Sequence, residues 1–466
     1  MKNYLVFTMA TLLLGTACSS KKEHAEGFTG APGEVKLITL DPGHFHAALV
    51  QKVSYPQVSK DVYVYAPTGF DVNEHLKRIE GFNTRAENPT LWNEIVYTGT
   101  DYLEKMLAEK KGNVMIQAGN NGKKTEYIKK TLEAGINVLS DKPMAINSQN
   151  FKLLEECFDI ARQKNVLLYD IMTERNEITT MLQRELSTIP AIYGEQLKGS
   201  PDEPAIVKES VHHLFKLVDN KPLTRPVWYF DVTQQGEGLV DVTTHLVDLV
   251  QWEAFPEQII DYKKDIELVD ANRWTTSISP EEFKQVTGTD DYPDFLKKDV
   301  ENDTLKVYCN GDIVYKIKGV TAKVSVIWNY TFPEGGGDTH FSVMKGSKAD
   351  LVIRQGQEQG YKPELYIEAL PDIDLAAYEK ELAAAMSTVA DKYPGVALDK
   401  VSDNVWQVQI PATYRVGHEA HFGQVMENYL QYLQDGKLPD WEVPNMIAKY
   451  YVTTHALEMA KVKAKK

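Results

Sequence analysis

The side chains best suited to proton transfer are those of His245 and Asp241, which lie four positions apart after Gly236 and Gly238. On a helix this spacing places both side chains on one face. Imidazole titrates close to neutral pH, and a neighbouring carboxylate stabilises its protonated form. We therefore predict that His245 is a general base positioned by Asp241. A helix-surface pair without a role is the alternative.

A lysine follows a short apolar strand in the motif Asp141-Lys142-Pro143. In open α/β sheets, ligands bind at the carboxyl ends of the strands. An ammonium group at that edge is suited to donate to a substrate hydroxyl and to the ribose of a nicotinamide cofactor. A solvated loop lysine is the alternative that this motif alone leaves open.

The turn after the first predicted strand reads DPGHFHA over positions 41–47. A dinucleotide-binding turn carries three glycines, which let the backbone approach a pyrophosphate. Here Gly43 is the only glycine, and no ribose-binding acid follows directly after the second predicted strand, 61–65. We hypothesise that His44 and His46 bond phosphate in place of glycine amides. Packing within the turn is the alternative.

The first part of the chain must position these motifs, and it alternates short strands with helical stretches. Such alternation, with strands that are apolar throughout, is typical of a parallel sheet covered by helices on both faces. Strands are predicted at 35–40, 61–65, 113–117, 138–140 and 166–169, with helices near 47–50, before Gly135 and over 150–163.

Beyond about residue 190 the pattern changes to strands joined by short turns, which favours one antiparallel sheet. The predicted fold class is α/β: a Rossmann-type doubly wound parallel sheet (34–175), followed by an α+β domain with a large open antiparallel sheet (176–466). Strands of this second domain are predicted at 226–232, 305–308, 313–318, 322–330, 340–344 and 350–354, with a turn at 310–312. Helices are predicted at 239–252, 375–389 (within an insertion, 366–410), 419–433 and 445–464.

The composition excludes several classes of protein. With 43% hydrophobic and 25% charged residues, the chain is globular rather than disordered. A net charge of −15 without a basic block excludes a nucleic-acid partner, since binding phosphates requires clustered lysine and arginine.

Cys157 and Cys309 allow one disulfide or two buried free thiols, and their apolar neighbours favour thiols. No metal site is expected. The side chains of His212, His213, Asp241 and His245 are of types that bind transition metals, but adjacent histidines on a regular element point apart.

The N-terminus predicts a bacterial lipoprotein. A lysine, a short apolar stretch and small residues precede Cys18, which we expect to be lipidated after removal of a signal peptide, 1–18. A plain signal peptide is the alternative. A polar tether (19–33) would follow, so that the protein meets the membrane only through its lipid anchor. We expect it at the cell envelope, either periplasmic or exposed at the surface.

Together these motifs resemble the family of glucose–fructose oxidoreductase, inositol dehydrogenase and rhizopine-catabolism proteins (Gfo/Idh/MocA), over nearly the whole mature chain. Asp141-Lys142-Pro143 stands where that family usually has Glu-Lys-Pro, and Thr244 where it usually has glycine. The resemblance extends to Asn121 after the 113–117 strand, to the segment 344–349 and to the closing helix, 418–439.

The resemblance implies the roles of the site residues. Lys142 would contact substrate and nicotinamide ribose, His245 would accept the proton, and Asp241 would position substrate and base. Arg175 would lie in the substrate cleft. The cofactor, NAD or NADP and tightly bound, would contact Gly43, His44, Phe45, Asn121, Asp141 and Lys142.

We therefore predict a nicotinamide-dependent oxidoreductase acting on a sugar hydroxyl or glycoside. Two alternatives remain: a glycoside hydrolase or lyase that uses tightly bound NAD as a redox relay, and a non-catalytic, tethered sugar-binding protein. The expected partner is a small carbohydrate, and a homo-oligomer formed through the open sheet is also possible.

Overall fold

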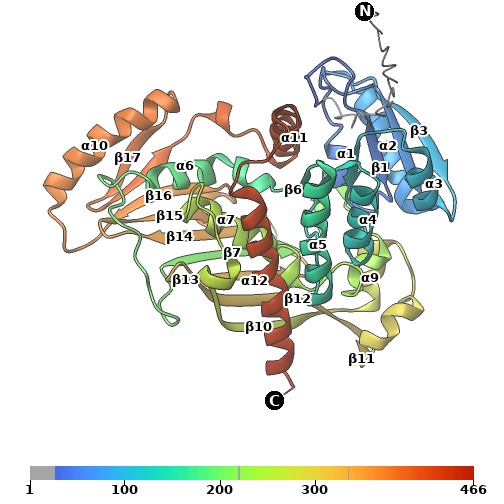
Figure 1. The fold of residues 1–466 in the computed structure, drawn as a ribbon. Coiled ribbons are helices and arrows are strands. Elements are labelled where there is room, and N and C mark those ends of the chain that lie inside the picture. The colour runs from blue at the N-terminus through green and yellow to red at the C-terminus, as the bar shows by residue number, and fades with distance from the viewer. Residues whose placement is uncertain (1–26, 219–220, 334, 466) are drawn as a thin grey trace, which may run out of the picture.

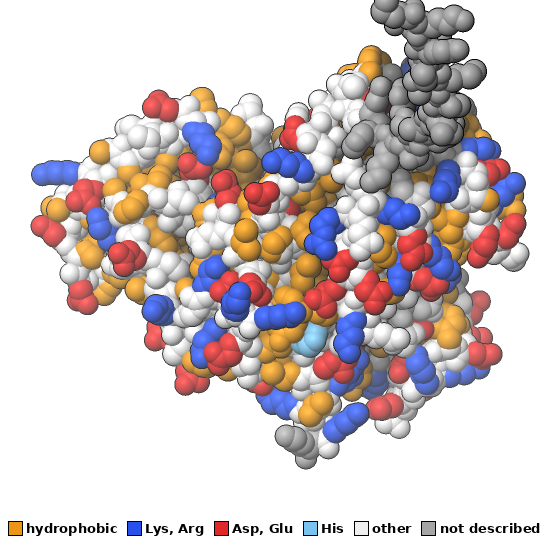
Figure 2. All heavy atoms as spheres, in the orientation of Figure 1, with side chains coloured by type: hydrophobic (Ala, Val, Ile, Leu, Met, Phe, Trp, Pro, Cys, Tyr) orange, Lys and Arg blue, Asp and Glu red, His pale blue; other side chains and the backbone are white. Residues whose placement is uncertain are grey.

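The computed structural model describes residues 27–218, 221–333 and 335–465 (Figure 1). The predicted signal peptide 1–18, its Cys18 and residues 19–26 of the predicted tether lie outside this part of the chain. None of the described helices is both long and apolar enough to span a membrane. On the face seen in Figure 2, basic and acidic side chains intermingle.

A parallel six-stranded sheet, in the order β3-β2-β1-β4-β5-β6, confirms the predicted Rossmann-type fold within the described residues. The strand order reverses at β1, where Thr39 pairs with both Val64 and Ile116, and ligands of such sheets bind at the carboxyl ends beside this point. The strands are β1 (Leu37–Leu40), β2 (Asp61–Ala66), β3 (Asn93–Thr98), β4 (Val114–Gln117), β5 (Asn137–Asp141) and β6 (Leu168–Ile171). The helices between them are α1 (His46–Leu49), α2 (Phe70–Thr84), α3 (Tyr102–Glu109), α4 (Asn121–Glu133) and α5 (Ser148–Lys164).

The second sheet, ten-stranded within the described chain, is mixed rather than purely antiparallel as expected. Its one parallel pair joins β7 to β13, where Val324 faces Lys208. The strands are β7 (Ile206–His213), β10 (Ile266–Ile278), β11 (Val300–Glu301), β12 (Thr304–Ile317), β13 (Val320–Asn329), β14 (Thr339–Lys345), β15 (Ala349–Gln355), β16 (Glu364–Ala369), β17 (Ala397–Ser402) and β18 (Val405–Gln409). The short pair β8 (Leu217–Val218) and β9 (Lys221–Pro222) lies apart from it.

Two sequence predictions in this region are wrong. The expected turn at 310–312 is the middle of the continuous strand β12, and the expected strand at 226–232 is mostly the 3₁₀ turn η2 (Val227–Phe230). Gly311 is explained by close packing, because a Cβ there would lie 2.5 Å from Leu239 Cδ2 and 2.6 Å from Asn272 O. The glycine therefore marks contact with the adjacent 3₁₀ turn η3 (Gly238–Val240), not a hairpin.

The remaining helices and 3₁₀ turns cover the second sheet and connect the two parts. They are η1 (Thr173–Asn176), α6 (Ile178–Ser187), α7 (Thr243–Ala254), α8 (Tyr262–Asp265), α9 (Pro280–Thr287), η4 (Asp294–Asp299), η5 (Gln357–Gln359), α10 (Leu375–Lys392), η6 (Ala412–Tyr414), α11 (His418–Asp435) and α12 (Glu442–Lys463). In Figure 1, α12 runs beside α5 of the first domain and α7 of the second, so the C-terminal helix packs against both domains.

The two C-terminal helices complete the hydrophobic core of the first sheet. Phe422, Met426 and Tyr429 of α11 are buried at helical spacing in the same cluster as β1, β4 and β5. Burying each such side chain contributes about 1.5–3 kcal/mol. Cys157 belongs to this core as a free thiol and Cys309, half-buried, is also free, as expected.

A buried carboxyl near the edge of the first sheet predicts a pH-dependent stability. Glu94 accepts a hydrogen bond from Gln51 Nε2 (2.7 Å), and its other oxygen lies 4.0 Å from His75 Nε2 without a hydrogen bond. Burial raises the pKa of Glu94 to about 7, against the bond from Gln51. In the folded protein the carboxyl of Glu94 keeps its proton up to about pH 7, whereas in the unfolded chain it loses the proton near pH 4.5. The free energy of unfolding therefore decreases as the pH rises from about 4.5 to 7.

We expect Glu94→Gln to remove this loss. Its free energy of unfolding should match that of the wild type at pH 5 and exceed it by about 2 kcal/mol at pH 8. Urea unfolding at both pH values measures the difference. Equal stabilities at pH 8 would contradict the burial argument.

Candidate active site

The loops after β1, β4 and β5 meet at the carboxyl edge of the first sheet, where the fold predicts a ligand. The turn after β4 fits against the turn after β1 only because residue 119 is glycine: a Cβ on Gly119 would lie 2.4 Å from Asp41 O. The cis peptide Lys142-Pro143 follows β5. Residues of all three loops thus face the second domain across one edge.

Lys142 and Asp241 form a buried ion pair across this edge. The Nζ of Lys142 donates to Asp241 Oδ1 (2.8 Å), and Gln235 Nε2 donates to Asp241 Oδ2 (3.1 Å). Although burial opposes it, the carboxylates of Asp241 and Asp141 raise the pKa of Lys142. Despite the same burial, Lys142 and Gln235 lower the pKa of Asp241. Both groups are therefore charged at neutral pH.

His245 lies in the first turn of α7, whereas Asp241 precedes that helix. The predicted shared helix face is therefore wrong, and Asp241 hydrogen-bonds to Lys142 and Gln235 rather than to the imidazole. The Nδ1 of His245 is buried without a hydrogen-bond partner in the described structure. Burial, and then the ammonium of Lys142, lower the pKa of His245 to about 3. The imidazole is neutral and has a free lone pair.

A second histidine, to which the sequence assigns no chemistry, stands beside this group. His418 begins α11, and its Nδ1 lies 3.3 Å from Glu174 Oε1. Against the effect of burial, Glu174 raises the pKa of His418. Despite its own burial, Glu174 has its pKa lowered by His418 and, more weakly, by His245. The site therefore offers a neutral imidazole, His245, and a second imidazole, His418, whose pKa the carboxylate of Glu174 raises.

Histidines of the second sheet extend the polar surface. His212 and His213 both pair with Asp338, their Nδ1 atoms 3.5 and 3.0 Å from its oxygens. His340 Nδ1 lies 3.0 Å from Ser210 Oγ. Adjacent histidines of a strand were expected to point apart, but the imidazoles of His212 and His213 both reach the carboxylate of Asp338.

The turn after β1 has little free hydrogen-bonding capacity. The N–H of Gly43 donates to Asp41 O (2.9 Å) and that of His44 to Ala118 O (3.2 Å). Trp228 packs so closely that a Cβ on Gly43 would lie 3.0 Å from its ring. Phe45 packs beside His44, with ring centroids 4.6 Å apart.

Trp228 belongs to a stretch that we call the crossing segment, residues 226–236, which also touches the start of α4. Asn121 Nδ2 donates to Gln235 O (2.7 Å), and the N–H of Gly122 donates to Gln234 O (2.8 Å). The crossing segment of the second domain therefore lies over two turns of the first domain, the one after β1 and the one after β4.

An acid that the sequence pattern missed lies at this turn. Asp71, in the first turn of α2, accepts a hydrogen bond from Trp228 Nε1 (3.0 Å), and a Cβ on Gly43 would lie 3.1 Å from its Oδ2. Asp71 and Gly43 line a pocket with His44, Arg225 and Tyr229. The dinucleotide-binding pattern expects this acid directly after β2, whereas Asp71 lies in the first turn of α2, five residues after the end of that strand.

Arg175 lies in a buried ion-pair network. Its Nε and Nη2 each donate to Asp248 (2.7 Å), and its Nη1 donates to Glu442 Oε1 (2.7 Å). Lys449 lies 2.8 Å from both Asp248 and Asp170. The Nε, Nη1 and Nη2 atoms of Arg175 all donate to these buried carboxylates. The contact of Arg175 with a substrate therefore remains a prediction.

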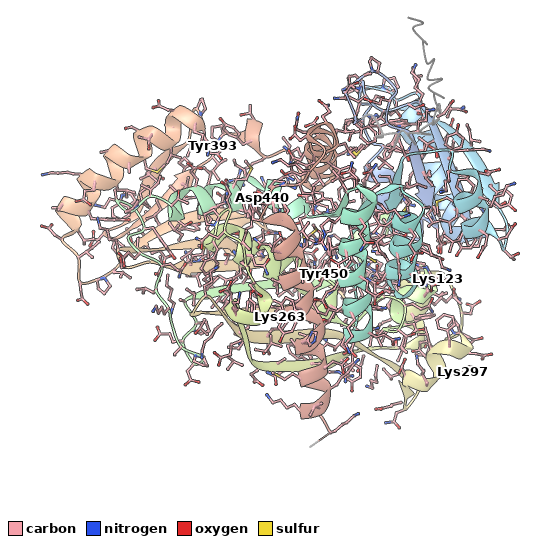
Figure 3. The ribbon with its side chains drawn as sticks, viewed as in Figure 1. Lys123, Lys263, Lys297, Tyr393, Asp440 and Tyr450 are labelled. Atoms are coloured by element: carbon pink, nitrogen blue, oxygen red, sulfur yellow. The ribbon has the colours of Figure 1, made fainter. Side chains whose placement is uncertain are left out.

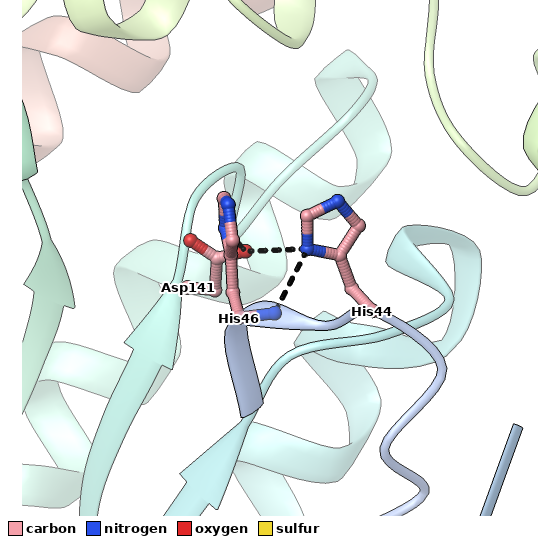
Figure 4. A group of neighbouring side chains, drawn as sticks. All are labelled: His44, His46 and Asp141. Carbon is pink, nitrogen blue, oxygen red and sulfur yellow. Dashed lines mark hydrogen bonds and ion pairs between the residues drawn. The ribbon is translucent and has the colours of Figure 1, made fainter. Parts of the chain in front are cut away.

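The last group joins two loops at the sheet edge (Figure 4). His46 Nδ1 lies 3.0 Å and His44 Nδ1 3.9 Å from Asp141 Oδ2. The structure thus brings together the predicted residues His44, His46, Asp141, Lys142, Asp241 and His245, and it adds Asp71, Glu174 and His418.

Comparisons with known proteins show the family and the fold of the chain. Residues 182–461 match the family model described as "Putative oxidoreductase C terminal domain", and residues 72–170 match "Oxidoreductase family, NAD-binding Rossmann fold". No curated protein is significantly similar to the chain. A crystal structure of a "putative oxidoreductase" from Parabacteroides merdae ATCC 43184 is 88% identical, with a TM-score of 0.93, and covers 94% of this chain and 100% of its own.

More distant solved structures share the fold. Levoglucosan dehydrogenase in complex with NADH is 13% identical over 92% of this chain and 97% of its own, with a TM-score of 0.60. A 3-ketoreductase from Actinomadura kijaniata in complex with NADP and TDP-benzene is 12% identical over 90% of this chain and 95% of its own, with a TM-score of 0.54.

Proposed function

Because the chain belongs to the Gfo/Idh/MocA family of NAD-binding oxidoreductases, we propose that it transfers a hydride between a nicotinamide cofactor and a hydroxyl-bearing carbon of a sugar or glycoside. The observation that carries this proposal is the charged Lys142–Asp241 pair beside an imidazole, His245, that lacks a hydrogen-bond partner on its buried nitrogen. Related folds bind sugars or sugar-nucleotide analogues with NADH or NADP, which supports a carbohydrate substrate.

The residues present fit the redox end of such a cofactor. Lys142 lies at the carboxyl end of β5, and the unpartnered His245 supplies the acceptor that the chemistry requires. The bound nicotinamide ring would accept or return the hydride. The phosphate end is built differently from a glycine-rich turn, because its amides are occupied and Trp228 lies against Gly43.

The chain's own groups divide the proton chemistry. Lys142 donates to the substrate oxygen and stabilises the negative charge that develops there, while Asp241 keeps the ammonium oriented. In this proposal the buried, unpartnered Nδ1 of His245 carries the ring N–H, so that the lone pair that accepts the hydroxyl proton lies on Nε2. Glu174 lies close enough to stabilise the imidazolium that results.

Asp71 is proposed to accept hydrogen bonds from the ribose hydroxyls of the cofactor. Its carboxylate lies beside the β1 turn, as the ribose acid of a dinucleotide fold does. This placement favours NAD over NADP, because a 2′-phosphate would meet a negative charge. The crossing segment, bonded to Asn121 and Gly122, supports the proposal that the cofactor is held tightly.

The proposal is tested by measuring whether the purified protein retains a bound nucleotide. The purified full chain, denatured and examined by mass spectrometry, should release about one equivalent of NAD or NADP. A chain that releases none, even after incubation with coenzyme, yet binds sugar would refute the proposal. That result would favour the alternative of a tethered sugar-binding protein.

One observation favours the redox-relay alternative as a second candidate. His418, whose pKa is raised by the nearby Glu174, lies beside the proposed base His245 and is proposed to protonate a leaving group. Release of p-nitrophenol from nitrophenyl glycosides without net formation of NADH would establish the relay. Stoichiometric NADH formation would establish the simple dehydrogenase.

We further propose that the enzyme acts at the bacterial cell envelope, anchored through lipid on Cys18. The motif before that cysteine supports this proposal. We also propose that a homo-oligomer forms through the second sheet, whose strands carry the exposed side chains of Phe341 and Trp274.

A further inference from the structure

We propose that His44, His46 and Asp141 form a binding site for a divalent transition-metal ion. In the part of the chain that the structure describes, these are the only three histidine, cysteine or carboxylate side chains whose ligand atoms all lie within 4.8 Å of one another. Figure 4 shows both imidazoles and the carboxylate converging from the β1 turn and the end of β5. The sequence predicted no metal site. Asp141 is 95 positions from His46, and no local pattern indicates that their side chains come together.

The distances between the three ligand atoms are close to those around a tetrahedrally coordinated zinc ion. Asp141 Oδ2 lies 3.0 Å from His46 Nδ1 and 3.9 Å from His44 Nδ1. Ligands about 2.0–2.1 Å from a zinc ion stand roughly 3.4 Å apart at tetrahedral angles. Two imidazoles with one carboxylate are a donor set that zinc and cobalt accept, and three protein ligands leave one position open.

The surrounding residues already hold two of the three ligands in place. The ring of His46 packs against Phe422 at 4.6 Å between centroids. The Nζ of Lys124 donates to the backbone oxygen of Asp141 (2.9 Å), not to its carboxylate. The Nδ1 of His44 accepts one long hydrogen bond, from the backbone N–H of His46 (3.3 Å). A metal ion bound to this nitrogen would replace that hydrogen bond. Such outer contacts orient ligands before the metal arrives.

The local charge indicates what fills the open position. Metal ion, Asp141 and the buried Lys124 together carry a net charge of about +2, while the nearby Lys142 is neutralised by Asp241. A pyrophosphate carries about two negative charges, and His44 belongs to the turn where a dinucleotide fold places that group. The proposed ligand is therefore a phosphate oxygen, with the metal replacing the amides and glycines that this turn lacks. This last step rests on the proposed function.

Cobalt binding tests the site without any assay of activity. The full chain, freed of metal by a chelator and dialysed, is titrated with Co²⁺ and the visible d–d absorption is recorded. We expect saturation near one equivalent, displacement by Zn²⁺, and affinity at least about 100-fold weaker in His44→Ala and in Asp141→Asn. His455→Ala, on α12 and outside the cluster, should bind as the wild type does, and circular dichroism verifies that each variant is folded.

Three outcomes separate the parts of this inference. Absence of stoichiometric Co²⁺ binding, or equal binding by folded His44→Ala and Asp141→Asn, overturns the metal site. A Co²⁺ spectrum unchanged by saturating NAD and NADP overturns the phosphate ligand. A chain that binds Co²⁺ as expected but holds neither nucleotide refutes the proposed function and supports the metal site.

Discussion

Replacing His245 with alanine is expected to lower kcat by about 10²–10⁴-fold while leaving the fold unchanged. The imidazole is the proposed proton acceptor, its Nδ1 has no hydrogen bond to lose, and its side chain is only partly buried. The substitution therefore removes a reacting group without breaking a bond that holds the protein together. KM should change much less than kcat, because substrate binding relies on Lys142 and neighbouring groups.

Steady-state kinetics on a sugar identified by screening NAD reduction would measure this loss. His455→Ala is the matched control, since it removes a half-buried histidine of α12 from outside the cleft. Thermal unfolding should be nearly the same for both variants. Retention of more than about a third of wild-type kcat by His245→Ala would show that another group, such as His418, accepts the proton.

Lys449→Met is expected to destabilise the protein by about 3–5 kcal/mol. The Nζ of Lys449 lies 2.8 Å from Asp170 and 2.8 Å from Asp248, and all three side chains are essentially inaccessible to water. Asp248 keeps its two bonds from Arg175, but Asp170 keeps only the hydroxyl of Tyr450, labelled in Figure 3, which donates at 3.0 Å. A buried carboxylate without a counter-charge is the source of the loss.

The same helix supplies the control for this prediction. Lys463 pairs with Asp270 at the surface, so Lys463→Met should cost less than about 1 kcal/mol. Urea unfolding followed by circular dichroism measures both changes. The double variant Asp170→Asn/Lys449→Met should recover part of the loss, because the amide carries no charge. A Lys449→Met variant as stable as the Lys463→Met control would contradict the argument that a buried carboxylate without a counter-charge destabilises the fold.

Local patterns in the sequence were sufficient for much of the fold. Apolar strands alternating with helices predicted the Rossmann-type sheet, and its order β3-β2-β1-β4-β5-β6 confirms that prediction. The family followed from Asp141-Lys142-Pro143 and the Asp241–His245 segment, and the matching family models confirm it. These features depend on residues close together in the chain, where periodicity and motif spacing are informative.

Contacts between distant residues decided the rest. Lys142 meets Asp241 across 99 positions, His46 meets Asp141 across 95 and Arg175 meets Glu442 across 267. Gly311 looked like a turn residue, and only the packing of Leu239 against β12 shows why glycine is required there. A sequence pattern records which side chains are available, but their partners and charges are fixed by burial and by the meeting of loops at one sheet edge.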